Sequence, residues 1–263
     1  RIGVAKADSV VDLALLEHCV REDLGQTVPR AMAVLQPLKL VLTNWPEDKR
    51  DELPLENHPD HPEWGTHLSV MTRELYIEQE DFMEVPAKKY FRLFLGGEVR
   101  LKGAYIIRAD RCDKDENGNV TCVYCTVDMD TRNGSEGANR KVKGTLHWVS
   151  ATENLPMEAR LYEPLLVEEG DQADEAVADE KPEEESAAPS SALKKDFLKR
   201  LNPNSLVTCH GFMEKSLADA KPGDKYQFLR MGYFCKDPDS TAEKAVFNLV
   251  VGLKDSFKKE VKA

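Results

Sequence analysis

The chain has 263 residues, a length that suggests roughly one to three domains with hydrophobic cores of good size. Apolar residues make up 41% of it, and because no run reaches about 18 of them, a membrane-spanning helix is excluded. The net charge of −11 is concentrated in residues 168–185, where ten acids and one lysine give −9 and leave −2 for the rest. The remaining surface can therefore carry basic patches.

The first predicted element is an amphipathic helix over residues 8–24. Its apolar residues recur at helical spacing, and Asp8 or Ser9 is a suitable N-cap. Gly25 is a suitable C-terminal stop, because glycine adopts the left-handed conformation that often ends a helix.

From residue 29 onward the sequence is typical of β structure. Short alternating or β-branched runs are separated by clusters of Pro, Gly, Asn and Asp, with Asn-Gly pairs at hairpin positions. The spacing predicts an all-β barrel or sandwich and not alternating strands and helices. The first set of runs covers residues 33–45, 67–77, 90–110, 118–128 and 140–150, and the second covers 157–167, 205–212, 225–237 and 245–255.

An acidic segment, residues 168–192, interrupts the second set of strands. It is rich in Glu, Ala, Pro and Ser and too polar to pack, so it is predicted to be a disordered loop. Residues 193–201, LKKDFLKRL, are predicted to form a short amphipathic helix after it.

The sequence contains no catalytic motif that we can assign. It has no dinucleotide-binding glycine pattern, no P-loop, no G-x-S-x-G and no H-E-x-x-H, so no catalytic residue is predicted. His58, Asp60 and His61 are conceivable metal ligands, but two prolines make this segment an extended loop, and no metal site is predicted. Cys122 and Cys125 form one C-x-x-C without the second pair that a zinc site needs. We interpret the six cysteines as buried free thiols, typical of the reducing cytoplasm.

A basic run with interleaved aromatic residues extends from Lys88 to Arg111. Its cations are Lys88, Lys89, Arg92, Arg100, Lys102, Arg108 and Arg111, and its aromatic residues are Tyr90, Phe91, Phe94 and Tyr105. On a strand, Arg100 and Lys102 share one face, so two cations can line one groove. Single-stranded RNA loops are held by cations and planar side chains of this kind. The alternative is that the cations face solvent and the aromatic residues belong to the core.

Several motifs stand in order along the chain. They are PRAMAV from Pro29, the NHP of residues 57–59, YFRLFLGGEVRLKGAYII at 90–107, CTVDMDT at 125–131, KVKGTLHWVSATENLP at 141–156, RLYEPLL at 160–166, and GYFCKD with STAEKAVFN within 232–248. Together they closely resemble the C-terminal anticodon-binding half of bacterial-type glutaminyl-tRNA synthetases. The likeness covers essentially the whole chain outside residues 168–192, and such an ordered series is far more specific than any one motif.

The resemblance implies a mainly β fold, with two β-barrels of the kind seen in a ribosomal 5S-RNA-binding protein, preceded by a short helical connector. The connector to the catalytic domain would be residues 1–28 and the proximal barrel residues 29–147 plus 237–263. The distal barrel would be residues 148–236, with the disordered acidic insert at 168–192. The family's catalytic motifs precede this region, so the chain by itself is not expected to aminoacylate. No cofactor is expected in this chain, and ATP and magnesium are expected in the full-length ligase.

By motif match, the resemblance also assigns contacts with the anticodon. Arg30 of PRAMAV, together with Gln227 and Arg230 of YQFLR, resembles the family's contacts with the middle base. Arg92 of YFRL resembles the arginine that reads the third base, a guanine in glutamine tRNA. An arginine can bridge O6 and N7 of a guanine edge, which is consistent with that role.

Arg100 and Lys102 of EVRLKG resemble the basic pair near the first anticodon base. Lys102 replaces an arginine of the better-known enzymes, and lysine offers a point charge in place of a planar fork.

Two other functions stay open at this stage. One is the equivalent module of a β-barrel-type glutamyl-tRNA synthetase, and the other is a free-standing ribosomal-type RNA-binding barrel protein. The guanine-reading Arg92 favours glutamine, and the missing initiator methionine with the connector helix argues against a free-standing protein. The expected partners are the anticodon stem-loop of glutamine tRNA and the chain's own catalytic domain, with no membrane, and the chain is expected to be a monomer.

Overall fold

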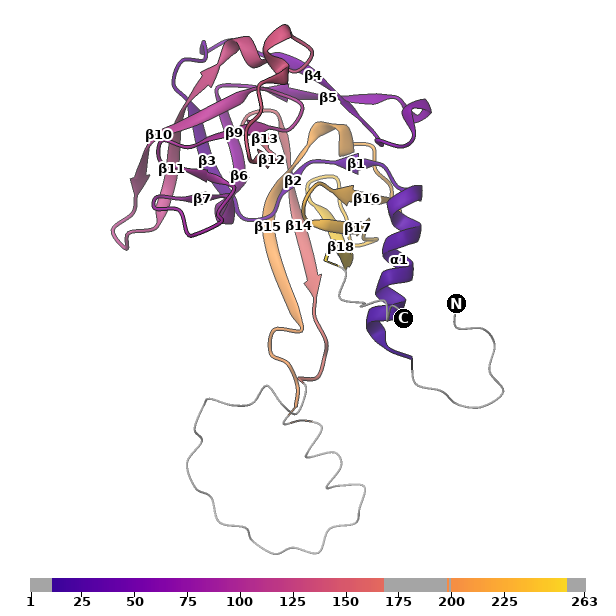
Figure 1. Cartoon of the computed structure of the whole chain (residues 1–263). Helices are drawn as coiled ribbons and strands as arrows, with labels where there is room; N and C mark the ends of the chain where they lie inside the picture. The colour runs from indigo at the N-terminus through magenta and orange to yellow at the C-terminus, as the bar shows by residue number, and fades with distance from the viewer. Residues whose placement is uncertain (1–10, 168–197, 199, 255–263) are drawn as a thin grey trace, which may run out of the picture. The chain divides into compact units, whose positions relative to one another are not determined.

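The computed structural model describes residues 11–167, 198 and 200–254. Within these ranges the fold is mainly β, with one α-helix ahead of two seven-stranded sheets, called here sheet A and sheet B (Figure 1). Both sheets are barrel-like, so the prediction of a short helix followed by two β-barrels is confirmed. None of the helical segments in the described part of the chain is long and apolar enough to cross a membrane.

The helix, α1, runs from Leu13 to Thr27, and Asp12 is its N-cap, whose carboxylate accepts a hydrogen bond of 2.9 Å from the Ala14 N–H. The predicted caps, Asp8 and Ser9, lie outside the described residues. The predicted stop at Gly25 is wrong, because the helix continues through it to Thr27.

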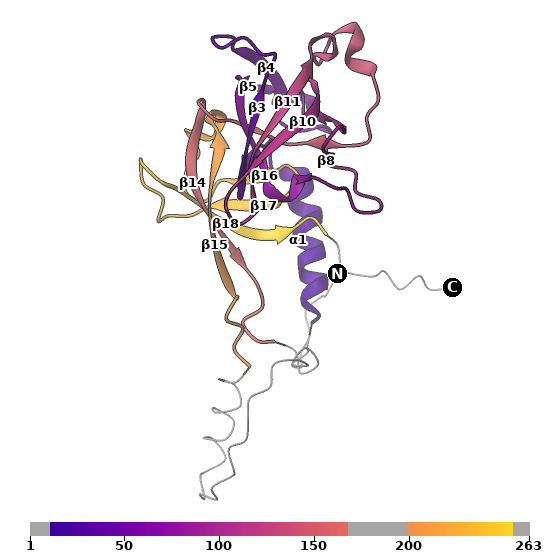
Figure 2. The same ribbon diagram turned by 90° about the vertical axis from the view of Figure 1, so that its left-hand side faces the viewer.

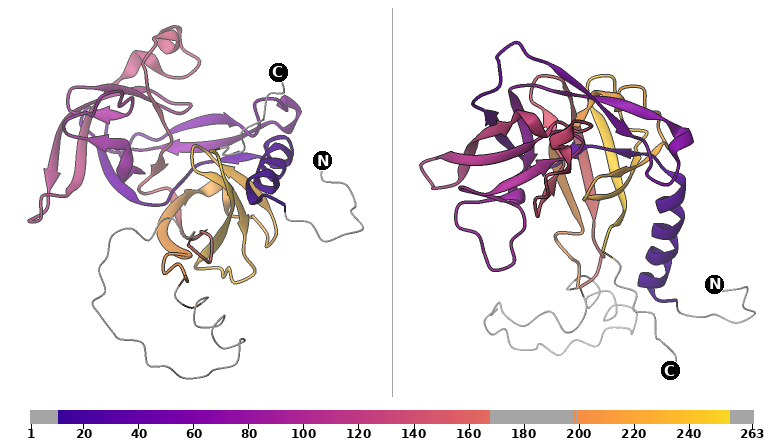
Figure 3. Two further views of the ribbon diagram at one scale, coloured as in Figure 1. Left: turned by 60° about the horizontal axis from the view of Figure 1, so that its bottom comes forward. Right: turned by 45° about the horizontal axis from the view of Figure 1, so that its top comes forward.

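Gly25 has a packing role in place of the expected capping role. A Cβ added there would lie 3.2 Å from the Tyr233 hydroxyl, so glycine lets α1 approach sheet A closely. Leu24 and Val28 of the helix region pack with Tyr233 and Val251, and Figure 3 shows the helix beside the C-terminal strands.

Sheet B takes its strands from the first part of the chain. Its order is β12 (Thr145–Leu146), β9 (Glu98–Leu101), β10 (Ile106–Lys114), β11 (Val120–Asp128), β3 (Pro37–Leu42), β6 (Glu74–Glu78) and β13 (Val149–Ser150). Figure 2 shows β10 and β11 side by side, as expected for an antiparallel pair. Two smaller ladders accompany it: β4 (Asp51–Glu56) with β5 (Thr66–Met71), and β7 (Phe82–Met83) with β8 (Leu93–Phe94).

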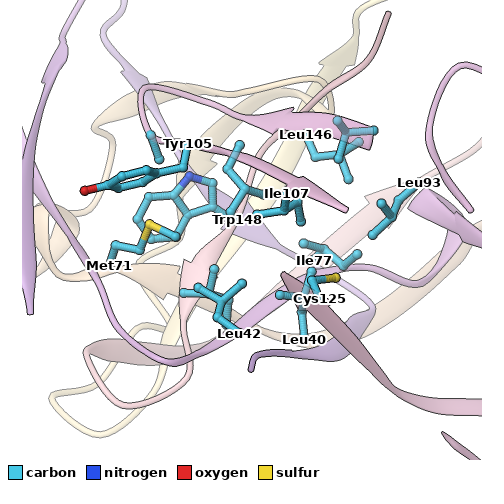
Figure 4. Packing of buried hydrophobic residues seen from close by; sticks show 14 of the residues in the cluster. Leu40, Leu42, Met71, Ile77, Leu93, Tyr105, Ile107, Cys125, Leu146 and Trp148 are labelled. Atoms are coloured by element: carbon cyan, nitrogen blue, oxygen red, sulfur yellow. The ribbon is translucent and has the colours of Figure 1, made fainter. Parts of the chain in front are cut away.

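The core of sheet B is built from alternate residues of these strands. In β3 every second residue is buried, as the period of two along a strand requires. Trp148 lies within the core near Tyr105 and Met71, and its indole N–H donates 3.0 Å to the Lys102 carbonyl (Figure 4). This bond satisfies the indole N–H, which would otherwise be buried without a hydrogen-bond partner.

Sheet A combines strands from both ends of the chain. Its order is β1 (Arg30–Ala31), β16 (Lys225–Phe228), β17 (Gly232–Lys236), β18 (Ala245–Gly252), β14 (Asn154–Tyr162), β15 (Leu206–Glu214) and β2 (Ala33–Val34). Phe228, Phe234 and Phe247 form its aromatic core, with ring centroids 4.6 Å and 5.2 Å from Phe228.

The strand pairing can be set beside the predicted division of the chain between the two barrels at three places. Strand β18 pairs with β17 in sheet A, whereas the resemblance placed residues 237–263 with the proximal barrel. The short connection after Lys236 makes β18 the antiparallel neighbour of the strand that precedes it. Strands β1 and β2 also lie in sheet A, and β13 extends the first barrel's set of strands beyond residue 147.

The described residues within 160–208 belong to a second compact unit. Its described part is held by a bridge between Leu166 and Leu201 and by the Asn202 N–H, which donates 2.8 Å to the Leu165 carbonyl. The predicted acidic loop at 168–192 and the helix predicted at 193–201, apart from residues 198, 200 and 201, lie outside the described residues.

Candidate nucleic-acid interface

Arg30 and Gln227 are brought together by a short parallel strand pair. Strand β1 pairs with β16 so that Arg30 is directly opposite Gln227. The Arg30 N–H donates 2.7 Å to the Asn57 carbonyl, and the Gln227 N–H donates 2.9 Å to the Pro29 carbonyl. The side-chain Nε of Arg30 is buried and has no hydrogen-bond partner among the described residues. The structure therefore leaves one buried guanidinium N–H of Arg30 without a partner among the described residues.

Arg30 also lines a groove of about 490 Å³ together with Arg100 and Lys102. Asn133 and His67 add polar groups to the same wall. The volume is in the range of pockets of about 300–1,000 Å³ that hold small organic groups. Three of the six residues assigned to the anticodon thus share one concave surface.

The two cations from β9 and the turn after it differ in availability. Arg100 donates to three backbone carbonyls, those of Thr131 at 3.0 Å, Ala138 at 2.8 Å and Arg140 at 3.2 Å. Burial, followed by the charge of Arg140, lowers the pKa of the Arg100 guanidinium. Much of the hydrogen-bonding capacity of the Arg100 guanidinium is therefore used to hold residues 131–140 in place.

Lys102 is exposed, and its ammonium has no ion-pair or hydrogen-bond partner within the described ranges. Its backbone is fixed on both sides, because its N–H donates 2.8 Å to the Leu146 carbonyl and its own carbonyl accepts from Trp148. The backbone of Lys102 is therefore held in place, whereas no partner among the described residues holds its ammonium group.

Arg92 and Arg230 lie in a second group, around the carboxylate of Asp81. Arg230 binds it with two bonds of 2.6 Å, and Arg92 Nη1 lies 3.3 Å from the same carboxylate. Arg92 Nη1 also pairs with the Glu80 carboxylate at 2.7 Å. On the other side, His147 Nδ1 is 3.4 Å from Arg230 Nη1. We call this set of five residues the Asp81 cluster.

The charges of the Asp81 cluster stabilise one another. Burial lowers the pKa of Arg230, but the hydrogen bonds and charge of Asp81, with Glu80 and Glu78 behind it, outweigh burial and raise that pKa. Burial and the charge of Asp81 also raise the pKa of nearby Tyr90 to about 12. The arginine is therefore held cationic, and the phenol is neutral at physiological pH.

An aromatic and basic surface adjoins Arg92. A groove of about 260 Å³ is lined by Phe91, Arg92, Lys141 and Lys143. The Phe91 side chain is 54% exposed, and the Lys143 ammonium lies 5.8 Å from its ring centroid. Tyr105, in contrast, is buried, so the aromatic residues of the basic run are divided between core and surface.

The two segments considered as metal ligands have structural partners instead. His58 Nε2 is 2.8 Å from the Gly25 carbonyl, and the His61 ring stacks on Trp64 with centroids 4.4 Å apart. Cys122 and Cys125 are free thiols, and burial raises the pKa of each. In the part of the chain that the structure describes, no three His, Cys, Asp or Glu residues are grouped to hold a metal ion.

Comparison with known proteins identifies the family of these domains. Residues 28–128 match the family model described as "tRNA synthetases class I (E and Q), anti-codon binding domain", and residues 145–237 match a second model with the same description. The chain belongs to this anticodon-binding family. The resemblance inferred from the ordered motifs is thereby confirmed.

Several proteins that are similar to this chain are named glutamine–tRNA ligases. The chain is 52% identical over 258 residues to the ligase of Clostridium perfringens and 47% identical over 258 residues to that of Aliivibrio fischeri. It is 46% identical over 260 residues to the ligase of Vibrio cholerae. Each alignment covers 98% of this chain and 43% of the relative, so the chain spans less than half the length of these ligases.

The six residues assigned from the motifs thus fall into two groups. Sequence reasoning missed Asp81, Glu80 and His147, which orient two of the assigned arginines. The run Glu78 to Asp81, EQED, has the composition of a solvated turn, and only the apolar residues on both sides of it, Ile77 and Phe82, indicate that it enters the core.

Proposed function

We propose that this chain binds the anticodon loop of glutamine tRNA as the anticodon-binding part of a glutamine–tRNA ligase. The observation that carries the proposal is the meeting of Arg30, Arg100 and Lys102 at one groove in a member of the anticodon-binding family. Cations along such a groove attract the phosphates of a single-stranded loop, and exposed rings such as Phe91 offer a surface for unstacked bases.

Two features support the proposal that different residues contact different bases of the anticodon. Arg30 lines the groove and lies directly opposite Gln227, which suits recognition of one base edge by both side chains. Arg92 presents a guanidinium beside an exposed ring, which suits a stacked guanine. The proposed contacts are Arg30, Gln227 and Arg230 with the middle base, Arg92 with the third base, and Arg100 and Lys102 with the first base.

The wider activity is proposed from the relatives. We propose that in the full-length ligase ATP and magnesium act at a catalytic domain, and that anticodon binding helps to position the acceptor end of the tRNA there. We propose that the chain works in that setting in the cytoplasm as a monomer, and that alone it binds tRNA without charging it.

The names of the relatives favour glutamine over glutamate among the two amino acids of the family. Alignment with 43% of much longer ligases also favours a module of an enzyme over a free-standing ribosomal-type protein.

Binding to purified tRNAs tests the proposal. The chain should bind glutamine tRNA more tightly than glutamine tRNA with a replaced third anticodon base, by roughly 5- to 150-fold if one bidentate arginine contact is lost. It should give no charged tRNA with ATP and glutamine. Equal binding to both tRNAs, or charging by the chain alone, would contradict the proposal.

A further inference from the structure

Asp81 is a buried carboxylate that joins two arginines from distant parts of the chain. Its side chain is 0% exposed, and it follows β6 of sheet B, whereas Arg230 follows β16 of sheet A. Arg230 has a φ of +67°, which non-glycine residues rarely adopt, so its backbone is strained in the conformation that meets Asp81. Such strain persists only where the surrounding contacts hold it.

The guanidinium groups, unlike Asp81, reach the surface. The side chains of Arg92 and Arg230 are 35% and 31% exposed. Asp81 therefore occupies their inner side and leaves their outer N–H groups to solvent. In the Asp81 cluster the two guanidinium groups face two carboxylates, those of Asp81 and Glu80, and Oδ1 of Asp81 lies within 3.3 Å of both arginines, so the positions of the two side chains are coupled.

We propose that Asp81 is a positioning residue for anticodon recognition, which holds Arg92 and Arg230 in one fixed orientation so that their outer N–H groups discriminate between bases. Asp81 itself does not touch RNA, because it is fully buried and bears the same sign of charge as phosphate. The inference rests on the proposed function and extends it to a residue outside the RNA-binding surface.

If Asp81 positions the two arginines, replacing it should keep or raise the affinity for RNA and lower the preference for guanine. In Asp81→Asn the carboxylate charge is lost, so Arg230 loses its charged partner and Arg92 is held by Glu80 alone. Both guanidinium groups can then turn toward phosphates nearby. Binding to all RNAs should then become as strong or stronger, with a salt slope steeper by about 0.7 for each added phosphate contact on a single strand. The preference for guanine should fall at the same time. A purely structural role predicts the reverse, a uniform loss of binding together with a lower melting temperature.

The test compares anticodon stem-loops of glutamine tRNA that carry guanine or adenine at the third position. We expect the roughly 5- to 150-fold preference of the natural chain to drop below about 3-fold in Asp81→Asn. The matched control is Glu84→Gln, which removes one negative charge on the other side of β7. Glu84 pairs with Lys114 and lies outside the Asp81 cluster, so this variant should keep the natural preference.

Each outcome of this test either supports or overturns the positioning role of Asp81. A folded Asp81→Asn that keeps the natural preference overturns the positioning role, as does an equal loss of preference in Glu84→Gln. If Asp81→Asn does not fold, Asp81→Glu keeps the charge but lengthens the arm, and full preference in that variant overturns the role as well. If the natural chain shows no preference, the proposed function fails, and with it this extension; if only the variants behave unexpectedly, the proposed function stands.

Discussion

Arg92 is the assigned residue whose replacement gives the sharpest expected result. Its polar contacts with Glu80 and Asp81 use one terminal nitrogen, Nη1, which lies 2.7 Å from the Glu80 carboxylate, 3.1 Å from the Glu80 carbonyl and 3.3 Å from the Asp81 carboxylate. The edge formed by Nε and Nη2 is therefore the one that can bridge O6 and N7 of guanine, a contact worth about 1–3 kcal/mol. Arg92→Ala should weaken binding of the guanine stem-loop by roughly 5- to 150-fold.

The variant should keep its fold, because Asp81 retains both bonds from Arg230 and the Arg92–Glu80 pair is partly exposed. Exposed ion pairs contribute only about 0–1 kcal/mol, so thermal melting should change little. Arg92→Lys should not restore the preference, since lysine can still pair with Glu80 but lacks the planar fork.

Fluorescence anisotropy with guanine and adenine stem-loops measures the effect. The control is Lys88→Ala in the same loop, which removes an exposed cation and should weaken both RNAs equally, with a salt slope lower by about 0.7. Equal losses on both stem-loops for Arg92→Ala would refute the assignment and leave Arg92 as a phosphate contact.

Three further outcomes follow from the geometry. Burial raises the pKa of Asp51, but hydrogen bonds from Arg132 and Tyr105 outweigh it and hold that pKa below its ordinary value. Asp51→Asn should therefore cost about 1–3 kcal/mol in urea unfolding near pH 7, and the difference should vanish as the pH falls below about 4, through the lowered pKa of Asp51. Gly211→Ala should destabilise the chain by more than about 2 kcal/mol because its Cβ would overlap a backbone carbonyl of β2, whereas Gly252→Ala, with open space around it, should be neutral or slightly stabilising in thermal melting. Arg100→Ala should lower both the melting temperature and RNA affinity, since three carbonyls lose their donor; unchanged melting would show that Arg100 is not structural.

Local sequence patterns predicted where the helix and the strands lie better than they predicted which elements contact one another. The apolar spacing located α1, and alternation located most strands, because both depend on neighbouring residues. Gly25 was misread as a stop because its role is a contact with Tyr233, far along the chain. The sheet to which β18 belongs could not be predicted either, since a strand's sequence specifies its buried face and not its neighbour.

The same limit applies to the site. The motifs pointed to Arg92 and Arg230, but they did not reveal that one carboxylate holds both. The Asp81–Arg230 bonds join residues 149 positions apart, and no local periodicity records such a contact. In the sequence, Asp81 is one of several acids in a polar stretch, and its burial becomes apparent only when sheet A is placed beside it.

The pairing of β1 with β16 has a consequence for how the chain acquires its structure. All the strands of sheet B are complete by Ser150, so that sheet can assemble while later residues are still being synthesised. Strands β1 and β2 must wait for β15 and β16, and contacts between such distant segments form slowly. A chain that ends before Lys225 would therefore leave Arg30, which lines the groove proposed to bind RNA, without its strand partner.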